Sequence, residues 1–286
     1  MMSATYSIDC HAKPDLALSS GASAVQDFPL LDASVRWHDT WIMLASLIAV
    51  LVAAPAFAGV EITPSQVRTG YFLAPDCTPS ADPSLYNECV CEASISKAQV
   101  SGVAPDAASA INASLAQLPE KLAEESCEGS PTAIPRDGLK VNTTSADYEV
   151  AYQNATTLTI LITYSTYGAG AEHPLDGTEG FTFDLASGKV VDPILYLKPE
   201  QLSKADSFIK QELARKYPLA LYEEAKTRAD PYLSENGCDS CTLYYGKGGW
   251  MVRFQITSIA PYMTGEPEVA IPADIIPPPE KLIVKS

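Results

Sequence analysis

Histidine is the residue whose scarcity most limits the chemistry of this chain. The 286 residues hold 3 histidines, His11, His38 and His173. A zinc site rich in histidine or a Ser-His-Asp triad would depend on His173, because the other two precede an expected cleavage site. The sequence also lacks a G-x-S-x-G nucleophile elbow and a glycine-rich phosphate loop. We therefore expect no metal and no cofactor, and we favour a non-catalytic protein over an enzyme.

His173 lies in a glycine-rich segment, Tyr164–Asp176, that follows the most strand-like run of the chain and reads YSTYGAGAEHPLD. One interpretation is a simple connection whose glycines allow a sharp path. A second is a recognition loop, since loops on a rigid scaffold commonly carry binding residues. Catalysis is the third. The candidate binding residues are Tyr164, Tyr167, Gly168, Gly170, Glu172 and His173.

Carboxylates near this segment are a further chemical resource. Asp176, Asp184 and Asp192 follow it closely in the sequence. We interpret them as turn and surface residues, because no spacing pairs two of them as a general acid and base.

The pair Cys238 and Cys241 matches the C-x-x-C motif. A redox motif of this type places its first cysteine at a helix N-terminus, which lowers the thiol pKa. Here the motif follows Asn236-Gly237 and precedes a strand-like run, so we expect a structural disulfide.

The remaining cysteines are Cys10, Cys77, Cys89, Cys91 and Cys127. Cys89 and Cys91 are separated by one residue and are poorly placed to pair with each other. We therefore expect Cys77 and Cys127 to be their partners, in an order that the sequence leaves open.

An uncharged apolar run, residues 41–54, precedes Pro55 and the small-residue motif Ala56-Phe57-Ala58. Together with Arg36 these features predict a signal peptide over 35–58. The alternative is a membrane anchor, which usually needs about 20 apolar residues. Residues 1–34 show no helical period, and we interpret them as a non-structured extension with translation starting at Val35.

Removal of residues 1–58 would leave six cysteines, an even number, as an oxidising compartment favours. We therefore expect a periplasmic or secreted protein. Membrane association is expected only if the run 41–54 is not cleaved.

The charge balance limits the class of partner. The chain has 19 Lys and Arg against 35 Asp and Glu, a formal net charge of −16, and residues 59–286 alone carry −13. Nucleic-acid binding needs a basic face, so we exclude nucleic acid as the expected partner. An acidic protein is instead steered toward basic partners.

Hydrophobic periodicity predicts both helices and strands. One helix begins at Pro105 and is expected to kink or split at Pro119, a second spans 199–217, and a third short helix lies within 219–236. Period-two alternation predicts strands at 93–100, 148–152, 158–164, 181–185, 250–256 and 269–271. Gly188 is expected at positive φ in a turn.

Adjacent strands with separate helices indicate an α+β fold with a largely antiparallel sheet and two to three packed helices, stabilised by disulfides, rather than βαβ units. The expected domain organisation is a loop-dominated, disulfide-pinned arm (59–92), the α+β domain (93–276) and a tail (277–286).

Four segments, taken in order, resemble a known family. They are Ala98–Gly102 with Ala110-Ile111-Asn112, Tyr167–Pro174, Phe183–Lys189, and Phe254 through Gly265. In these segments the chain resembles the extracytoplasmic domain of the RsiV anti-sigma factor. That domain also accompanies the PdaC peptidoglycan deacetylase and occurs in mycobacterial secreted immunogenic proteins.

The resemblance covers residues 93–276, with Glu172 inserted relative to the loop of the family, and no cytoplasmic anti-sigma segment is found. It implies the fold and an envelope location, but not sigma-factor regulation. Since the RsiV-type domain recognises lysozyme, it also implies a basic protein such as a lysozyme-like muramidase as a partner.

Three functions follow as hypotheses. The first is an exported, non-catalytic binding module of the cell envelope that recognises a lysozyme-like protein or a cell-wall component such as peptidoglycan. The second is an envelope enzyme acting on peptidoglycan or a related polymer. The third is a membrane-anchored envelope sensor.

Overall fold

The computed structural model describes residues 59–79, 86–125, 127–132 and 140–283. The expected extension 1–34, the expected signal peptide 35–58 and the expected start at Val35 therefore lie outside the described residues. Within the described part, no helix combines the length and the apolar character needed to cross a membrane.

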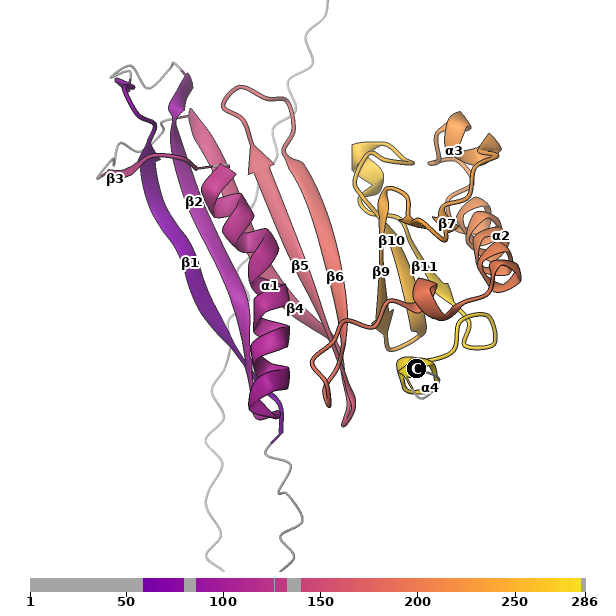
Figure 1. Cartoon of the computed structure of the whole chain (residues 1–286). Helices are drawn as coiled ribbons and strands as arrows, with labels where there is room; N and C mark the ends of the chain where they lie inside the picture. Colours follow the sequence, from indigo (N-terminus) through magenta and orange to yellow (C-terminus); the bar gives the residue numbers. More distant parts are fainter. Residues whose placement is uncertain (1–58, 80–85, 126, 133–139, 284–286) are drawn as a thin grey trace, which may run out of the picture. The chain divides into compact units, whose positions relative to one another are not determined.

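Six strands form the first sheet, in the order β3-β1-β2-β4-β5-β6 (Figure 1). Their bounds are β1 Glu61–Leu73, β2 Tyr86–Ser101, β3 Ser130–Thr132, β4 Lys140–Gln153, β5 Thr157–Tyr167 and β6 Leu175–Asp184. Neighbouring strands pair antiparallel with one exception, the parallel pair β2 and β4. The predicted α+β class and largely antiparallel sheet are confirmed.

The parallel pair corrects one expectation. Helix α1, Pro105–Glu125, lies on the connection from β2 to β4 and makes it a βαβ crossover. Parallel neighbours require a connection of a dozen or more residues, and α1 occupies most of it. The sequence did not predict this unit, because the hydrophobic patterns of the helix and of the two strands are the same whether or not these strands pair with each other.

Helix α1 covers one face of the first sheet (Figure 1). Its buried side chains recur every four residues: Ala107, Ile111, Leu115, Pro119 and Ala123. The helix continues through Pro119 and does not split there. Packing of this buried stripe offsets the hydrogen bond that proline cannot donate inside a helix.

Two polar contacts fix α1 on the sheet. The Asn112 side chain accepts from the Val100 N–H at 2.7 Å and donates to the Val100 carbonyl at 3.0 Å. Arg68 of β1 donates to the Ala123 carbonyl at 2.7 Å and to the Gly129 carbonyl at 3.2 Å. The last turn of α1 contains no basic residue, so Arg68 supplies the cation that a helix C-terminus favours.

The prediction that residues 59–92 are dominated by loops is wrong. Residues 61–73 form β1 and residues 86–92 begin β2. Polar residues and Pro64 hid β1 from pattern analysis, and edge strands tolerate both. Strand β3 pairs only with Tyr71–Leu73, so among the described residues the outer edge of β1 from 61 to 70 has no strand partner. A register shift between Gln66 and Arg68 also interrupts β1.

A tight turn after β6 places the chain beneath the start of α1. Gly188 has a φ of 71°, and a Cβ there would lie 2.4 Å from the Ala107 carbonyl oxygen. The positive φ expected at Gly188 is confirmed, and the close approach to the helix gives a second reason for glycine.

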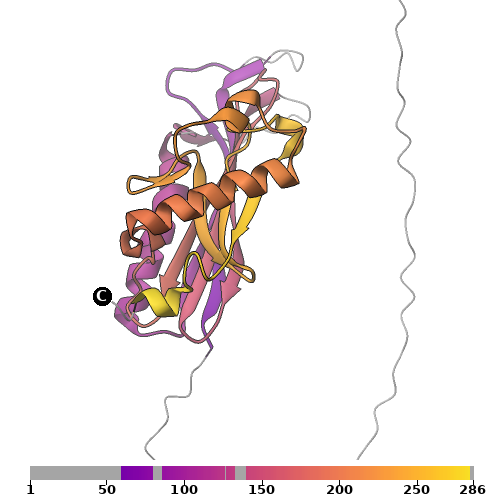
Figure 2. The ribbon, with the colours of Figure 1, turned by 90° about the vertical axis from the view of Figure 1, so that its right-hand side faces the viewer.

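The second sheet has the order β11-β10-β9, with β9 Cys241–Gly246, β10 Gly249–Phe254 and β11 Glu268–Ile271. Helix α2, Pro199–Lys216, crosses these strands (Figure 2) and buries Ile209 and Leu213 against Trp250 and Phe254. The remaining elements are η1 Pro193–Tyr196, α3 Glu223–Thr227, β7 Leu233–Ser234, β8 Gly237–Cys238, η2 Tyr262–Thr264 and α4 Pro279–Ile283.

Helix α4, five residues long, occupies the middle of the tail expected at 277–286. Its Leu282 is 2% exposed and belongs to the core around Trp250. The Trp250 indole N–H donates to the Pro277 carbonyl at 2.8 Å. The proline run begins the helix because proline fits its first turn.

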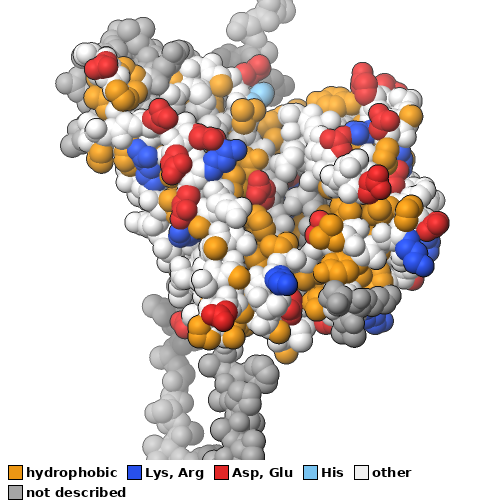
Figure 3. All heavy atoms as spheres, in the orientation of Figure 1, with side chains coloured by type: hydrophobic (Ala, Val, Ile, Leu, Met, Phe, Trp, Pro, Cys, Tyr) orange, Lys and Arg blue, Asp and Glu red, His pale blue; other side chains and the backbone are white. Residues whose placement is uncertain are grey.

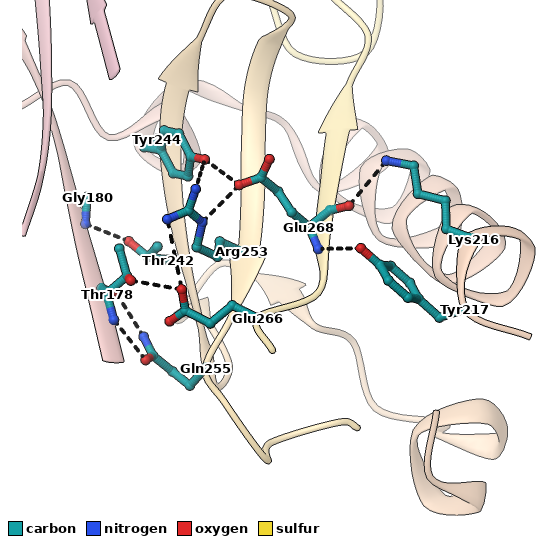
Figure 4. Close-up of polar contacts among 10 residues, drawn as sticks. All are labelled: Thr178, Gly180, Lys216, Tyr217, Thr242, Tyr244, Arg253, Gln255, Glu266 and Glu268. Carbon is teal, nitrogen blue, oxygen red and sulfur yellow. Dashed lines mark hydrogen bonds and ion pairs between the residues drawn. The ribbon is translucent and has the colours of Figure 1, made fainter. Parts of the chain in front are cut away.

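Thr242 of β9 and Gln255, the residue after β10, cover part of the outer edge of β6 (Figure 4). Gln255 accepts from the Thr178 N–H at 3.2 Å and donates to the Thr178 carbonyl at 2.9 Å. Thr242 accepts from the Gly180 N–H at 2.9 Å. These contacts satisfy backbone groups that an edge strand otherwise leaves open.

Candidate functional site

The predicted recognition segment forms the tip of the β5–β6 hairpin. Tyr164 and Tyr167 lie on β5, and residues 168–174 form the connection to β6. The Tyr167 hydroxyl donates to the Ala171 carbonyl at 2.8 Å, and the Ala169 N–H donates to the Asn142 side chain at 2.7 Å. Tyr167 and Asn142 therefore anchor the connection, in which Gly170 has a φ of 90°.

His173 stacks on Tyr262 of η2, which lies about 90 residues later in the sequence. The ring centroids are 4.6 Å apart and the planes meet at 13°. The Tyr262 hydroxyl donates to Asp176 at 3.0 Å, a bond that raises the pKa of Tyr262. Asp176 thus positions the aromatic pair and is not only a turn residue, as the sequence had suggested.

Polar and apolar groups are exposed together around this aromatic pair. The Glu172 carboxylate lies 4.0 Å from the His173 ring nitrogen, and its side chain is 91% exposed. Leu175 is 74% exposed and Met263 is 98% exposed. Exposed apolar side chains at one tip are typical of a contact surface. We call Tyr167, Glu172, His173, Leu175, Tyr262 and Met263 the hairpin tip.

Tyr164 lies on β5 before Tyr167 and does not belong to the hairpin tip. It is half-buried, and it packs against the cluster that contains Ala123 of α1. Burial and the nearby Glu179 and Glu266 raise the pKa of its hydroxyl. A Cβ on Gly177 would lie 2.4 Å from the Tyr164 hydroxyl, so glycine gives this ring its space.

A groove of about 510 Å³ crosses the first sheet beside the hairpin tip. Two rows of small polar residues line it, each row running across five strands. The first row pairs Thr69, Ser94, Ser145, Ser165 and Asp176 in register. The second row contains Gln66, Ser96, Asp147, Thr163 and Thr178. We call these ten residues the hydroxyl groove.

The hydroxyl groove lies on the sheet face opposite α1. Along β2, Cys91, Ala93 and Ile95 contribute to the cluster under α1, and Ser94 and Ser96 alternate with them. The Ser96 hydroxyl donates to the Asp147 carboxylate at 3.1 Å, which links β2 to β4 in the second row.

Glu266 lines the groove, and Figure 4 shows its contacts with Thr178 and Arg253. Its Oε2 accepts from the Thr178 hydroxyl at 2.9 Å and lies 3.9 Å from Arg253. Its Oε1 is buried without a partner among the described residues. Burial raises the pKa of this carboxyl, against the opposing effects of Thr178 and Arg253.

The carboxylates Asp147, Asp176 and Glu266 line the groove, whereas Lys, Arg and His do not contribute to its described lining. On the face of the molecule shown in Figure 3, acidic side chains spread over both sheets and basic ones lie singly or in small groups. In the ranges that the structure describes, no three His, Cys, Asp or Glu residues are placed to hold a metal ion.

The hydroxyl groove was missed by sequence analysis. Its serines and threonines alternate with apolar residues in runs such as Ala93-Ser94-Ile95-Ser96, which predict only a polar sheet face. The array exists because five strands pair in a particular register, and register joins residues far apart in the chain. No motif or periodicity in the sequence marked Glu266 as a functional residue.

Three disulfides join the cysteines of the described part. Cys238 pairs with Cys241, as predicted, at a Cα separation of 5.4 Å. The order that the sequence left open is Cys77–Cys89 and Cys91–Cys127, with Cα separations of 6.0 and 5.3 Å. Such bonds persist in oxidising compartments, so these pairs indicate a protein outside the cytoplasm.

No protein-family model matches the chain, and no curated protein matches its sequence. Among the solved structures that are similar to it are two members of one family. One is a DUF3298 family protein from Pseudomonas aeruginosa PAO1, with 16% identity, a TM-score of 0.43, and coverage of 75% of this chain and 92% of that one. The other is a DUF3298 family member from Bacteroides fragilis NCTC 9343, with 14% identity, a TM-score of 0.46, and coverage of 77% and 92%. The resemblance to RsiV-type domains does not conflict with them and stays a prediction.

Glu179 provides a test of the buried electrostatics beside Tyr164. Burial raises the pKa of its carboxyl above the ordinary value of 4.5, although Lys121 opposes the shift. The folded state therefore holds this proton more tightly than the unfolded chain, and its contribution to stability is lost as pH rises through the folded pKa. We expect Glu179→Gln to match the wild type below about pH 4.5 and to become more stable above it, by at most on the order of 1 kcal/mol.

Urea unfolding of both proteins from pH 4 to pH 8 measures this difference. The control is Glu124→Gln, the same change at an exposed position of α1. A difference between Glu179→Gln and the wild type that does not change with pH would contradict the assignment.

Proposed function

We propose that this chain is an exported, non-catalytic binding module of the bacterial cell envelope, and that the hairpin tip is its contact surface. The observation that carries the proposal is the stacked pair His173 and Tyr262, held by Asp176 beside exposed Leu175 and Met263. Aromatic side chains fixed by their neighbours lose little conformational freedom on binding, which favours them as interface anchors.

The charge of the protein favours a basic partner. Residues 59–286 carry a net charge of −13, and Glu172 adds an exposed carboxylate to the hairpin tip. Opposite net charges raise association rates, while affinity depends on local contacts. A lysozyme-like muramidase has this chemistry, and the resemblance to RsiV-type domains points to the same class.

Periplasmic or secreted location is part of this proposal. The disulfides and the signal peptide expected at 35–58 support it. If the run 41–54 stayed uncleaved, the protein would be a membrane-anchored sensor, and the mass of the protein in envelope extract distinguishes the two. If it were an envelope enzyme, His173→Ala would abolish turnover, whereas a binding module loses only affinity.

The test is titration against a panel of lysozymes at low and physiological salt. We expect Tyr262→Ala to weaken binding at least about 10-fold, because it removes one ring of the stack and a hot-spot tyrosine typically contributes this much or more. Binding of the wild type should also weaken as salt rises, since exposed charges are screened within about 10 Å at 0.1 M.

Tyr196→Ala on η1 is the control, because Tyr196 is an exposed tyrosine that lies outside the hairpin tip. It should bind like the wild type. The proposed partner is ruled out if no lysozyme binds at low salt. The proposed surface is ruled out if Tyr262→Ala, Tyr167→Ala and Glu172→Ala all bind as the wild type does.

A further inference from the structure

The hydroxyl groove offers unused hydrogen-bonding groups in a regular array. The hydroxyls of Ser94, Ser145, Thr163 and Ser165 have no hydrogen-bond partner among the residues that the structure describes. Each hydroxyl can donate one hydrogen bond and accept two. Neighbouring strands lie about 4.8 Å apart, so a row across five strands extends over about 19 Å. The groove can therefore contact an elongated ligand at several points.

The charges of the lining define which ligands fit. Asp147, Asp176 and Glu266 contribute carboxylates, and the described lining contains no Lys, Arg or His, although Arg253 behind it lies 3.9 Å from Glu266. An acidic ligand would be repelled at short range. A ligand that donates hydrogen bonds is favoured, because carboxylates only accept and Glu266 Oε1 is buried without a partner.

An aromatic surface stands at one end of the first row. Tyr262 is bound to Asp176, the last residue of that row, and His173 stacks on Tyr262. The negative face of an aromatic ring attracts the weakly positive C–H groups of a pyranose ring. Hydroxyls and carboxylates in a groove, with an aromatic pair beside its end, suit a polyhydroxylated ring better than a peptide, which would require more apolar lining.

We propose that the hydroxyl groove binds a glycan chain of neutral or amino-bearing pyranose units, lying along the rows with one sugar against Tyr262. The sugar hydroxyls donate to Asp147, Asp176 and Glu266 and exchange hydrogen bonds with the serine and threonine rows. This site is distinct from protein recognition at the hairpin tip and does not depend on it, although both share Tyr262.

The experiment is calorimetric titration of the protein, purified as its host processes it, with three tetrasaccharides. They are N-acetylglucosamine tetramer, which is neutral, glucosamine tetramer, which is cationic, and galacturonate tetramer, which is anionic. We expect the cationic tetramer to bind best, the neutral one to bind more weakly, and the anionic one not to bind. The proposal is overturned if the anionic tetramer binds as well as the neutral one or better.

The variant Ser145→Ala/Ser165→Ala removes two adjacent hydroxyls without adding bulk. It should weaken binding of the neutral tetramer at least about 10-fold, since each lost hydrogen bond typically weakens binding several-fold. Ser203→Ala, on the exposed side of α2, is the control and should bind like the wild type. Melting temperatures of both variants confirm that they remain folded.

The glycan site is refuted if the folded double variant binds the neutral tetramer as tightly as the wild type does. It is also refuted if neither the N-acetylglucosamine tetramer nor the glucosamine tetramer binds the wild type. The double variant should still bind the basic protein partner, because Ser145 and Ser165 lie outside the hairpin tip. Failure of the glycan titration and failure of the lysozyme titration are therefore separate results.

Discussion

Replacement of Trp250 by alanine should lower the free energy of unfolding by about 3–5 kcal/mol, the usual cost of truncating a large buried aromatic residue. Trp250 is 1% exposed, and it packs edge-to-face against Tyr245 with ring centroids 5.5 Å apart. Its loss would leave a cavity beneath α2 and an unpaired Pro277 carbonyl at the start of α4. Urea unfolding followed by circular dichroism measures the change.

Two further variants separate the causes of that loss. Trp250→Phe keeps an aromatic ring but removes the indole donor, and it should cost about 1–3 kcal/mol through the unsatisfied carbonyl. Met263→Ala should change stability by less than about 0.5 kcal/mol, because Met263 is 98% exposed. Equal effects of Trp250→Ala and Met263→Ala would show that the second sheet does not have the core described above.

Removal of the Cys91–Cys127 disulfide should be the second large perturbation. The two residues are 36 positions apart, and closing a loop of that length stabilises a protein by about 4 kcal/mol in the chain-entropy model. This bond also ties β2 to the end of α1, where Cys127 is fully buried. The double variant Cys91→Ala/Cys127→Ala should therefore unfold at markedly lower urea concentration.

The other disulfides provide matched controls, because their sequence separations are 12 for Cys77–Cys89 and 3 for Cys238–Cys241. The same model gives about 3 kcal/mol for the first and less than about 2 kcal/mol for the second. The expected order of destabilisation thus follows loop length. A larger loss for Cys238→Ala/Cys241→Ala than for Cys91→Ala/Cys127→Ala would contradict it.

Local patterns in the sequence predicted most of the individual elements. The alternation of Leu158, Ile160 and Ile162 predicts β5, and the spacing of Leu202, Ile209 and Leu213 predicts α2, because each set of apolar residues shares one face of its element. The short spacing of the C-x-x-C motif predicted the Cys238–Cys241 bond. Each of these inferences uses residues close together in the chain.

Long-range pairing could not be predicted in the same way. The parallel pairing of β2 with β4 depends on how α1 docks, and the contact of Asp176 with Tyr262 joins positions 86 residues apart. The hydroxyl groove depends on register across five strands at once. Periodicity therefore identified the hairpin that carries His173. The residues of η2 and of the second sheet that contact this hairpin could be recognised only in the structure.

The outer edge of β1 has a consequence for the behaviour of the protein at high concentration. An unpaired strand edge is a template on which another chain can add a strand, and long flat edges of this kind promote fibrils. Here Pro64 removes a backbone donor and the irregularity between Gln66 and Arg68 breaks the regular spacing of the edge. The features that concealed β1 in the sequence thus also oppose the addition of a second chain at this edge.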